Sequence, residues 1–352
     1  MHSRHAFLLF SLCASRSRSC SNFAMDNEYR LSADTMDFGS VPYQWVIITR
    51  PQGVPGIRSS RFGYVGFIGK LGSVLEEKRV ADGMNAAGLT CDSHTLLGTQ
   101  YPGRNESLDN IAADYICTWA LEGFSSVADL KAALGDVNFV EASDPFFQGQ
   151  QWIFRDAFGH GLVLEFLDGR MEAYDDFNDG GKTGFGILTN EPSFLWHNEA
   201  VRHLQWKQSL VRSAVEMPGS WYPEARFQRL HLVKSGMPTP SSYQEAIMQT
   251  VHVLNTVTVP MGSQRGTDSG KGEGLGDHTQ YAVIYDSKKR IVYWRTQVNQ
   301  NLQRLRLEDA GLEKGGQEQV IVAGSLQLPW FNDVSKTLTP KSTASTPGEL
   351  FD

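Results

Sequence analysis

The order of strand-like and helical segments sets the main limit on how this chain can fold. Residues 21–25 and 29–38 read as short strands, and Asp26–Asn27 favours a hairpin turn between them. The segments that follow are a strand at 44–49, strands at 61–69 and 88–96 on either side of a turn marked by Gly83 and Gly88, helices at 109–124 and 125–137, strands at 150–176 and 184–190, helices at 197–211 and 241–257, and strands at 281–286, 291–296 and 319–324. Because pairs of helices separate runs of strands, this order predicts α+β layers instead of a parallel βαβ array.

Composition and charge narrow the class of protein. With 352 residues, 41% of them hydrophobic, the chain can bury a large core. Its formal charge of −7 is spread along the sequence, and no basic run lies outside the first 20 residues, which argues against nucleic-acid binding. No segment after those residues has the unbroken apolar length of a membrane span.

The cysteines do not suggest a metal site or a disulfide framework. They stand at positions 13, 20, 91 and 117, without CxxC or Cys/His ligand spacing. His160 lies in an expected hairpin turn with no second His or Cys at ligand spacing. We therefore predict no metal, and we expect Cys91 and Cys117 to be packed thiols.

The first 19 residues read as a targeting peptide. The apolar run from Ala6 to Ala14 follows a positive start and is too short to cross a bilayer. Ser17 and Ser19 are small residues at positions −3 and −1 from Cys20, which favours signal cleavage there and a secreted or secretory-lumen protein. An organellar transit peptide stays open, since the segment is rich in Ser and Arg and lacks acids. We predict a domain at 20–334 and a disordered Ser/Thr/Pro-rich tail at 335–352.

Cleavage before Cys20 would change the chemistry of that residue. A terminal cysteine carries a free α-amine, with a reference pKa of ~8, beside a thiol with a reference pKa of ~8.5. The amine can therefore take the thiol proton and make Cys20 a nucleophile with its own base. If the leader stays on, Cys20 is an ordinary thiol and the chain reads as a structural or interaction domain.

Colinear motifs between Cys20 and about Ala323 give the chain a specific resemblance. They include "TMDF", "ADGMNAAGL", "GILTNEPSFLWH", "PEARFQRL", "VLNTVTVPMGS" and "HTQYAVIYD". In order and spacing, these motifs resemble the choloylglycine hydrolase family of N-terminal nucleophile hydrolases, which includes bile salt hydrolases and penicillin V acylases. The resemblance implies a four-layer αββα sandwich of two antiparallel sheets between helical layers.

The resemblance also implies an activity. A cysteine amidase of this family hydrolyses linear amide C–N bonds of small N-acyl substrates, such as conjugated bile salts, penicillin V or related N-acyl amino acids. It needs no metal or organic cofactor. Because family members are often oligomers, the resemblance is compatible with a homo-oligomer.

Five positions match the family's site. Cys20 matches the nucleophile, and Asp37 matches the aspartate that orients its α-amine. Asn190 matches the asparagine that stabilises the oxyanion, and Arg226 matches the later active-site arginine. Thr95 stands where bile salt hydrolases have Asn and penicillin V acylases have Tyr, so its backbone N–H is expected in the oxyanion hole and its side chain near the substrate.

One departure from the family pattern bears on activity. Asp34 replaces the first active-site arginine, and a like charge near a thiolate raises its pKa. Period-two counting puts Arg30 on the same side of the strand, which suggests it as a substitute. The competing hypothesis is a catalytically silent member that binds an amphipathic acyl ligand.

Two sets of neighbouring residues are left with open roles. His94 is expected either to line the site or to be structural. The aromatics near Asn190 and Arg226 are expected mostly in the core, with one or two bordering an acyl pocket: Trp196, Trp221, Tyr222 and Phe227.

Overall fold

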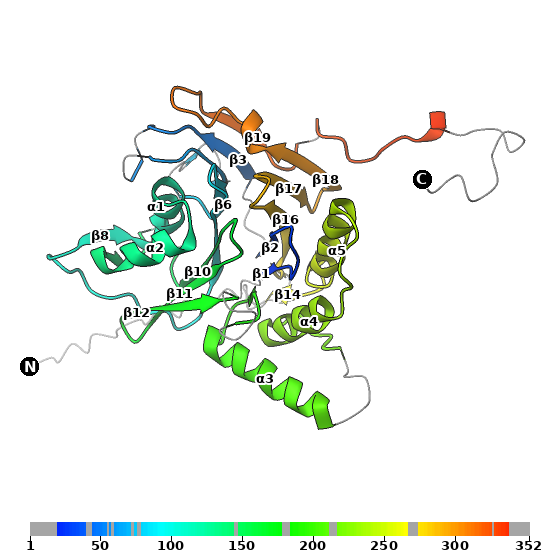
Figure 1. Ribbon diagram of the computed structural model, residues 1–352, viewed down its shortest axis with the longest axis horizontal. Helices are drawn as coiled ribbons and strands as arrows, with labels where there is room; N and C mark the ends of the chain where they lie inside the picture. The colour runs from blue at the N-terminus through cyan, green and yellow to red at the C-terminus, as the bar shows by residue number, and fades with distance from the viewer. Residues whose placement is uncertain are drawn as a thin grey trace, which may run out of the picture.

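Two large antiparallel sheets packed face to face form the centre of the protein (Figure 1). The computed structural model describes residues 20–39, 44–54, 56–57, 60–71, 74–75, 79–143, 147–177, 184–210, 217–266, 274–325 and 327–337. The expectations for the leader, and for the tail beyond residue 337, lie outside these residues. Ser335–Thr337, expected as the start of the disordered tail, forms a short 3-10 turn.

The six-stranded sheet carries the N-terminal hairpin. Its order is β13 (Ile187–Leu188), β1 (Ser21–Ala24), β2 (Leu31–Phe38), β16 (His278–Asp286), β17 (Ile291–Thr296) and β18 (Asn299–Arg306). The expected hairpin is confirmed, because β1 and β2 pair antiparallel with Ser21 opposite Thr35.

The nine-stranded sheet covers the other side of the central core. Its order is β12 (Arg170–Asp176), β11 (Gly161–Leu167), β10 (Gln150–Arg155), β7 (Thr90–Thr95), β6 (Asp82–Asn85), β4 (Tyr64–Leu71), β3 (Gln44–Arg50) and β19 (Gln319–Val322), and β5 (Val74–Leu75) pairs with β4. Two small sheets complete the strands: β8 (Asp109–Ala112) with β9 (Val137–Val140), and β14 (Arg265–Gly266) with β15 (Gly274–Leu275).

Helices cover the outer faces of both sheets, as Figure 1 shows. On the nine-stranded sheet, α1 (Ile116–Gly123) packs against β6 and β7, and α2 (Val127–Ala133) packs against β11. On the six-stranded sheet, α4 (Pro223–Ser235) packs against β1 and β13, α5 (Tyr243–Asn255) packs against β2, and α3 (Phe194–Leu210) packs against α4. The four-layer αββα sandwich is thus the observed architecture.

The period-two alternation of the strands explains why one strand serves two cores. On β2, Ala33 packs against the helices, whereas Met36 packs between the sheets. On β16, Ile284 and Tyr285 divide in the same way. Every alternate side chain of these strands therefore points into the space between the sheets, where polar residues have little access to water.

Some local predictions were wrong. The segment 109–124 was expected to be one helix, but it starts with the parallel strand β8, and only its second half is helical. Gly83 lies inside β6 and not in a turn. Helix α4 and strand β18 were not predicted, although Pro223 in the first turn of α4 is a recognised start signal.

The expectation of two separate packed thiols at Cys91 and Cys117 was also wrong. Both are buried, and they form a disulfide that joins β7 to α1. Spacing along the sequence could not show this pairing, since it depends on how α1 lies across the sheet.

Among the described residues, no helix combines the length and apolar character that crossing a membrane requires.

Candidate active site

Cys20 is the first described residue and lies directly before β1, with only 2% of its surface exposed. The hairpin register places it beside the end of β2 that carries Asp37, and its Sγ lies 4.0 Å from the Asp37 carbonyl oxygen. The hairpin therefore fixes the position of Cys20 relative to Asp37.

Arg226 ties the hairpin to the rest of the site. It projects from α4 and is fully buried. Its Nη1 donates to the Cys20 carbonyl oxygen and to Ser21 Oγ, both at 2.5 Å, and its Nε donates to the Trp221 carbonyl oxygen at 2.8 Å. Its Nη2 donates to Asn190 Oδ1 at 2.7 Å. One planar guanidinium thus holds the cysteine backbone and the Asn190 side chain at fixed relative positions.

Asn190 follows β13, and hydrogen bonds to both the oxygen and the nitrogen of its side-chain amide fix its orientation. Its oxygen accepts from Arg226, and its Nδ2 donates to the Thr95 carbonyl oxygen at 3.0 Å. Because an amide nitrogen carries two hydrogens, one N–H stays available to a substrate oxygen. The Thr95 side chain accepts a long hydrogen bond from Gln150 Nε2 at 3.5 Å.

Two threonines hold the Asp37 carboxylate. Thr35 Oγ1 donates to Oδ2 at 3.2 Å, and Thr279 Oγ1 donates to Oδ1. Burial raises the pKa of Asp37 to about 7, although the Arg226 charge and both threonines act against the rise. A carboxyl group poised near neutral pH would ionise fully beside a cation such as an α-ammonium group.

The Cys20 thiol is not activated by its side-chain neighbours. Burial raises its pKa well above the ordinary value, and the carboxylates of Asp34 and Asp37 raise it further. Among the described residues, no side-chain base is within hydrogen-bond distance of Sγ; the sulfur's one recorded partner is a backbone carbonyl. With its nitrogen in a peptide bond, Cys20 is therefore a protonated thiol.

Asp34 lies in a buried acidic cluster between the sheets. Its Oδ1 is 2.7 Å from His94 Nε2, and the carboxylates of Asp82 and Asp92 lie within 4.8 Å of its own. Burial, then the charge of Asp82, raises the pKa of Asp34 well above its ordinary value. Burial lowers the pKa of His94 to about 4, so the imidazole in this hydrogen bond is neutral at pH 7. Tyr281 donates to the Asp82 carboxylate.

The burial of Asp34 changes its expected effect on the thiol. The prediction that Asp34 raises the thiol pKa is confirmed in direction. Because burial favours the protonated form of Asp34, the negative charge that it places near the sulfur is reduced. His94 is structural in this arrangement, since its two nitrogens face Asp34 and the Thr189 carbonyl oxygen.

The five predicted site residues lie together, linked through Cys20–Arg226, Arg226–Asn190 and Asn190–Thr95 contacts and the Cys20–Asp37 approach. Their catalytic roles stay predictions. Sequence reasoning did not single out the supporting residues, which come from the hairpin and from three other strands: Ser21, Thr35, Asp82, Asp92 and Thr279.

Two lesser expectations were wrong. Arg30 precedes β2 with a left-handed φ of 57°, so period-two counting does not apply, and its side chain lies against Gly159 at the far end of the strand. Of the four aromatics expected mostly in the core, Phe227 alone is buried; Trp196 and Tyr222 are exposed and Trp221 is intermediate.

Comparison with known proteins identifies the family of this chain. The family model described as linear amide C–N hydrolases, choloylglycine hydrolase family, matches residues 20–322. The chain therefore belongs to the choloylglycine hydrolase family of linear amide C–N hydrolases, and the match begins at Cys20.

Individual relatives agree with this assignment. The chain is 26% identical to a bile salt hydrolase/transferase of Clostridium perfringens over 69% of this chain and 77% of that protein. It is 25% identical to a conjugated bile acid hydrolase of Lactobacillus acidophilus over 65% of this chain and 74% of that protein.

Solved structures share the fold. A variant of the conjugated bile acid hydrolase from Clostridium perfringens superposes with a TM-score of 0.72 at 22% identity, covering 89% of this chain and 100% of that one. Penicillin V acylase from Agrobacterium tumefaciens gives a TM-score of 0.70 at 19% identity, covering 88% and 94%. The fold is that of N-terminal nucleophile hydrolases.

Proposed function

We propose that this protein is a cysteine amidase that becomes active when the chain is cut before Cys20. The observation that carries the proposal is the unactivated thiol at the centre of an otherwise organised site. Cys20 is buried beside Asp37 and its carbonyl oxygen is held by Arg226, yet burial keeps its pKa high. Cleavage supplies the missing base, because it creates an α-amine on the same residue.

In the proposed reaction the Cys20 sulfur attacks the amide carbon and the α-amine takes the thiol proton. The carbonyl oxygen becomes an oxyanion, which accepts the free N–H of Asn190 and the backbone N–H of Thr95. The amine then gives its proton to the leaving nitrogen, the C–N bond breaks, and an acyl thioester remains on Cys20. Water hydrolyses the thioester and restores the thiol. Asp37 orients the amine, which as an ammonium group holds Asp37 in its ionised form.

The proposed substrates are linear N-acyl amides, including conjugated bile salts, penicillin V and related N-acyl amino acids. Two relatives named for bile acid or bile salt hydrolysis support this class, and so does the structural likeness to a penicillin V acylase. Thr95 has the smaller side chain compared with Asn or Tyr, so the substrate group that contacts this position is expected to differ from both.

We also propose that the chain matures in an oxidising compartment, after entry through its first 19 residues. The Cys91–Cys117 disulfide favours this, because such bonds persist mainly in secreted and secretory-lumen proteins. Asn105, in an Asn-Glu-Ser sequon, is exposed and accessible to glycosylation there. Intact mass and N-terminal sequencing of protein from a eukaryotic secretory host test both statements; a chain that retains residues before Cys20 contradicts the cleavage.

The test of the mechanism compares two chains that differ by one residue. One begins at Cys20, and the matched control begins at Ser19, which keeps the thiol but leaves the Cys20 nitrogen in a peptide bond. The chain beginning at Cys20 is expected to react at least tenfold faster with iodoacetamide at pH 7.5, and to release amine from a panel of N-acyl amides. Cys20 is the free cysteine among the described residues, so alkylation reports on it directly.

Either of two results would contradict the proposal. Equal alkylation rates in the two chains would show that the α-amine does not activate the sulfur. Amide hydrolysis by the chain beginning at Ser19 would show that another group acts as the base.

A further inference from the structure

A pocket lies at the other end of the β1–β2 hairpin from Cys20. It holds about 320 Å³ of empty space, counted out to its opening to solvent. Its walls come from both sheets, because the hairpin supplies one side and the β10–β11 turn supplies the other. The lining residues are Ala24, Met25, Arg30, Leu31, Ser32, Arg155, Asp156, Gly159, His160, Phe177 and Ser287.

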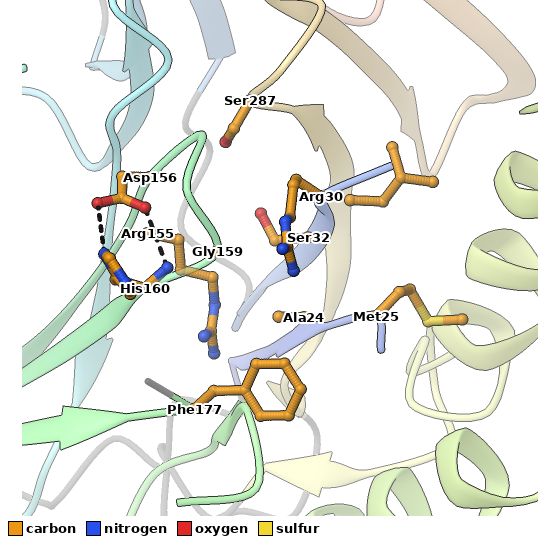
Figure 2. A pocket seen from close by; sticks show the side chains of 11 residues that line it. Ala24, Met25, Arg30, Ser32, Arg155, Asp156, Gly159, His160, Phe177 and Ser287 are labelled. Atoms are coloured by element: carbon orange, nitrogen blue, oxygen red, sulfur yellow. Dashed lines mark hydrogen bonds and ion pairs between the residues drawn. The ribbon is translucent and has the colours of Figure 1, made fainter. Parts of the chain in front are cut away.

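Two cationic side chains meet in this pocket. Figure 2 shows Arg30 and Arg155 extending into it from the two sheets, with the Phe177 ring at one end. The Arg30 guanidinium lies against Gly159, where a Cβ would sit 2.7 Å from Nη1. Gly159 has a φ of 92°, so this turn provides both the backbone and the space that let the arginine enter.

Buried polar atoms in the pocket lack partners among the residues that the structure describes. Arg155 is 4% exposed; its Nε donates to Asn22 Oδ1 and its Nη1 pairs with Asp176, but its Nη2 has no hydrogen-bond partner. Ser32 is 2% exposed, and its Oγ has none either. Buried donors are normally satisfied, because an unsatisfied one costs about 1–3 kcal/mol.

The two carboxylates near the pocket, Asp156 and Asp176, are already engaged by other groups and leave Arg30 without an ion pair. The Asp156 carboxylate already accepts backbone N–H groups from Val127, Phe158 and His160, and its Oδ2 lies 3.5 Å from His160 Nδ1. Arg30 makes no ion pair with any carboxylate of the described residues. An incoming group with oxygen acceptors and negative charge would therefore meet unused donors on Arg30, Arg155 and Ser32.

From this geometry we infer a binding site for a small oxyanion, a carboxylate or a phosphate, between Arg30, Arg155 and Ser32. The apolar side chains of Met25, Leu31 and Phe177 beside the cationic groups fit a short hydrocarbon attached to the anion. The site is separate from the amide chemistry, because Cys20 lies directly before β1 whereas Ala24, which lines the pocket, is the last residue of that strand. It connects to the buried acidic cluster through Asn22, which accepts from Arg155 and donates to Asp92 at 3.0 Å.

The test is calorimetric titration of the full chain with inorganic phosphate and, separately, with acetate, at ionic strength fixed with KCl. We expect one anion bound per chain, and affinity reduced at least tenfold in Arg30→Gln and at least threefold in Ser32→Ala. The matched control is Arg104→Gln, which removes an exposed arginine elsewhere and should change affinity less than twofold. Arg30 makes no recorded hydrogen bond or ion pair in the described structure, so its replacement should leave the fold intact, which circular dichroism checks.

Comparing the affinities for the two anions shows which chemical class of ligand the site prefers. Tighter binding of phosphate indicates a phosphorylated ligand, whereas tighter binding of acetate indicates a carboxylate, and either result supports the site. No binding of either anion overturns the inference, and so does equal weakening in Arg30→Gln and Arg104→Gln. Repeating the titration with Cys20→Ala separates this site from the proposed amidase, because anion binding should be unchanged there whether or not the protein hydrolyses amides.

Discussion

Replacing Arg226 by Met should greatly lower kcat/KM but reduce the free energy of unfolding only to a level at which the protein stays folded. The side chain makes four hydrogen bonds, to Cys20 O, Ser21 Oγ, Asn190 Oδ1 and Trp221 O. Hydrogen bonds from a charged donor contribute about 1.5–3 kcal/mol each, but methionine also avoids the cost of burying a guanidinium. The expected net loss is about 3–5 kcal/mol, as for other buried ionic groups that lose one partner.

That loss leaves most domains folded at 25 °C, since their free energies of unfolding are about 5–15 kcal/mol. The catalytic loss has a different origin. Without Nη2, the Asn190 amide is no longer held with its free N–H towards the substrate. Removal of one oxyanion donor lowers kcat by about 10²–10³-fold, and we expect kcat/KM to fall by that amount.

Arg229→Met is the matched control, one turn further along α4. Arg229 is also buried and donates to three backbone carbonyl oxygens, of Thr256, Pro218 and Ser220, none of which belongs to the site. We expect it to lose about 2–4 kcal/mol of stability and to keep kcat/KM within a factor of three. Urea unfolding and steady-state hydrolysis of the best substrate from the amide panel measure both quantities. The reasoning is refuted if Arg226→Met keeps kcat/KM within tenfold of the parent chain.

Three further predictions concern residues other than Cys20, Asp37, Asn190 and Arg226. Asp34→Asn should change kcat/KM at pH 7 by less than about tenfold, because burial and the charge of Asp82 already favour the neutral form of Asp34; a hundredfold rise in Cys20 alkylation would contradict this reasoning. Burial raises the pKa of Glu165 to about 7. The stability that its protonated form contributes to the fold is therefore fully present below the unfolded pKa of ~4.3 and disappears as pH rises through about 7. The free energy of unfolding of the parent chain should therefore rise by up to about 3 kcal/mol from pH 7.5 to pH 4.5 through Glu165, and Glu165→Gln should lack this rise. Urea unfolding of both chains at both pH values measures the difference. An equal pH dependence in the two chains would show that Glu165 does not titrate. The double variant Cys91→Ala/Cys117→Ala should unfold with about 3.5 kcal/mol less free energy, as expected for a loop of 26 residues, and keep its activity at 25 °C; unchanged stability would contradict the disulfide.

The order and spacing of the motifs allowed much of the candidate active site to be predicted from the sequence by resemblance. Cys20, Asp37, Asn190 and Arg226 were each ordinary when taken alone, and their motifs together identified the family and the sandwich. Arg30 shows where local reasoning failed: alternation along a strand predicts a face only while the backbone is extended, and Arg30 has a left-handed φ. The helix expected at 109–124 failed for a related reason, because pairing of β8 with β9 is a contact between segments distant in sequence.

The sequence by itself predicted most of the strand and helix blocks, and it proposes Cys20 as a nucleophile behind a removable leader. These properties depend on neighbouring residues, whose propensities and alternation act locally. The tertiary structure alone decided the raised pKa of Asp34, the Cys91–Cys117 bond and the pocket lined by Arg30 and Arg155. Each of these depends on which side chains the two sheets and a helix bring together in the folded protein. Away from water, the burial of a group and its hydrogen-bond partners change its pKa and its reactivity from the values usual for that residue type.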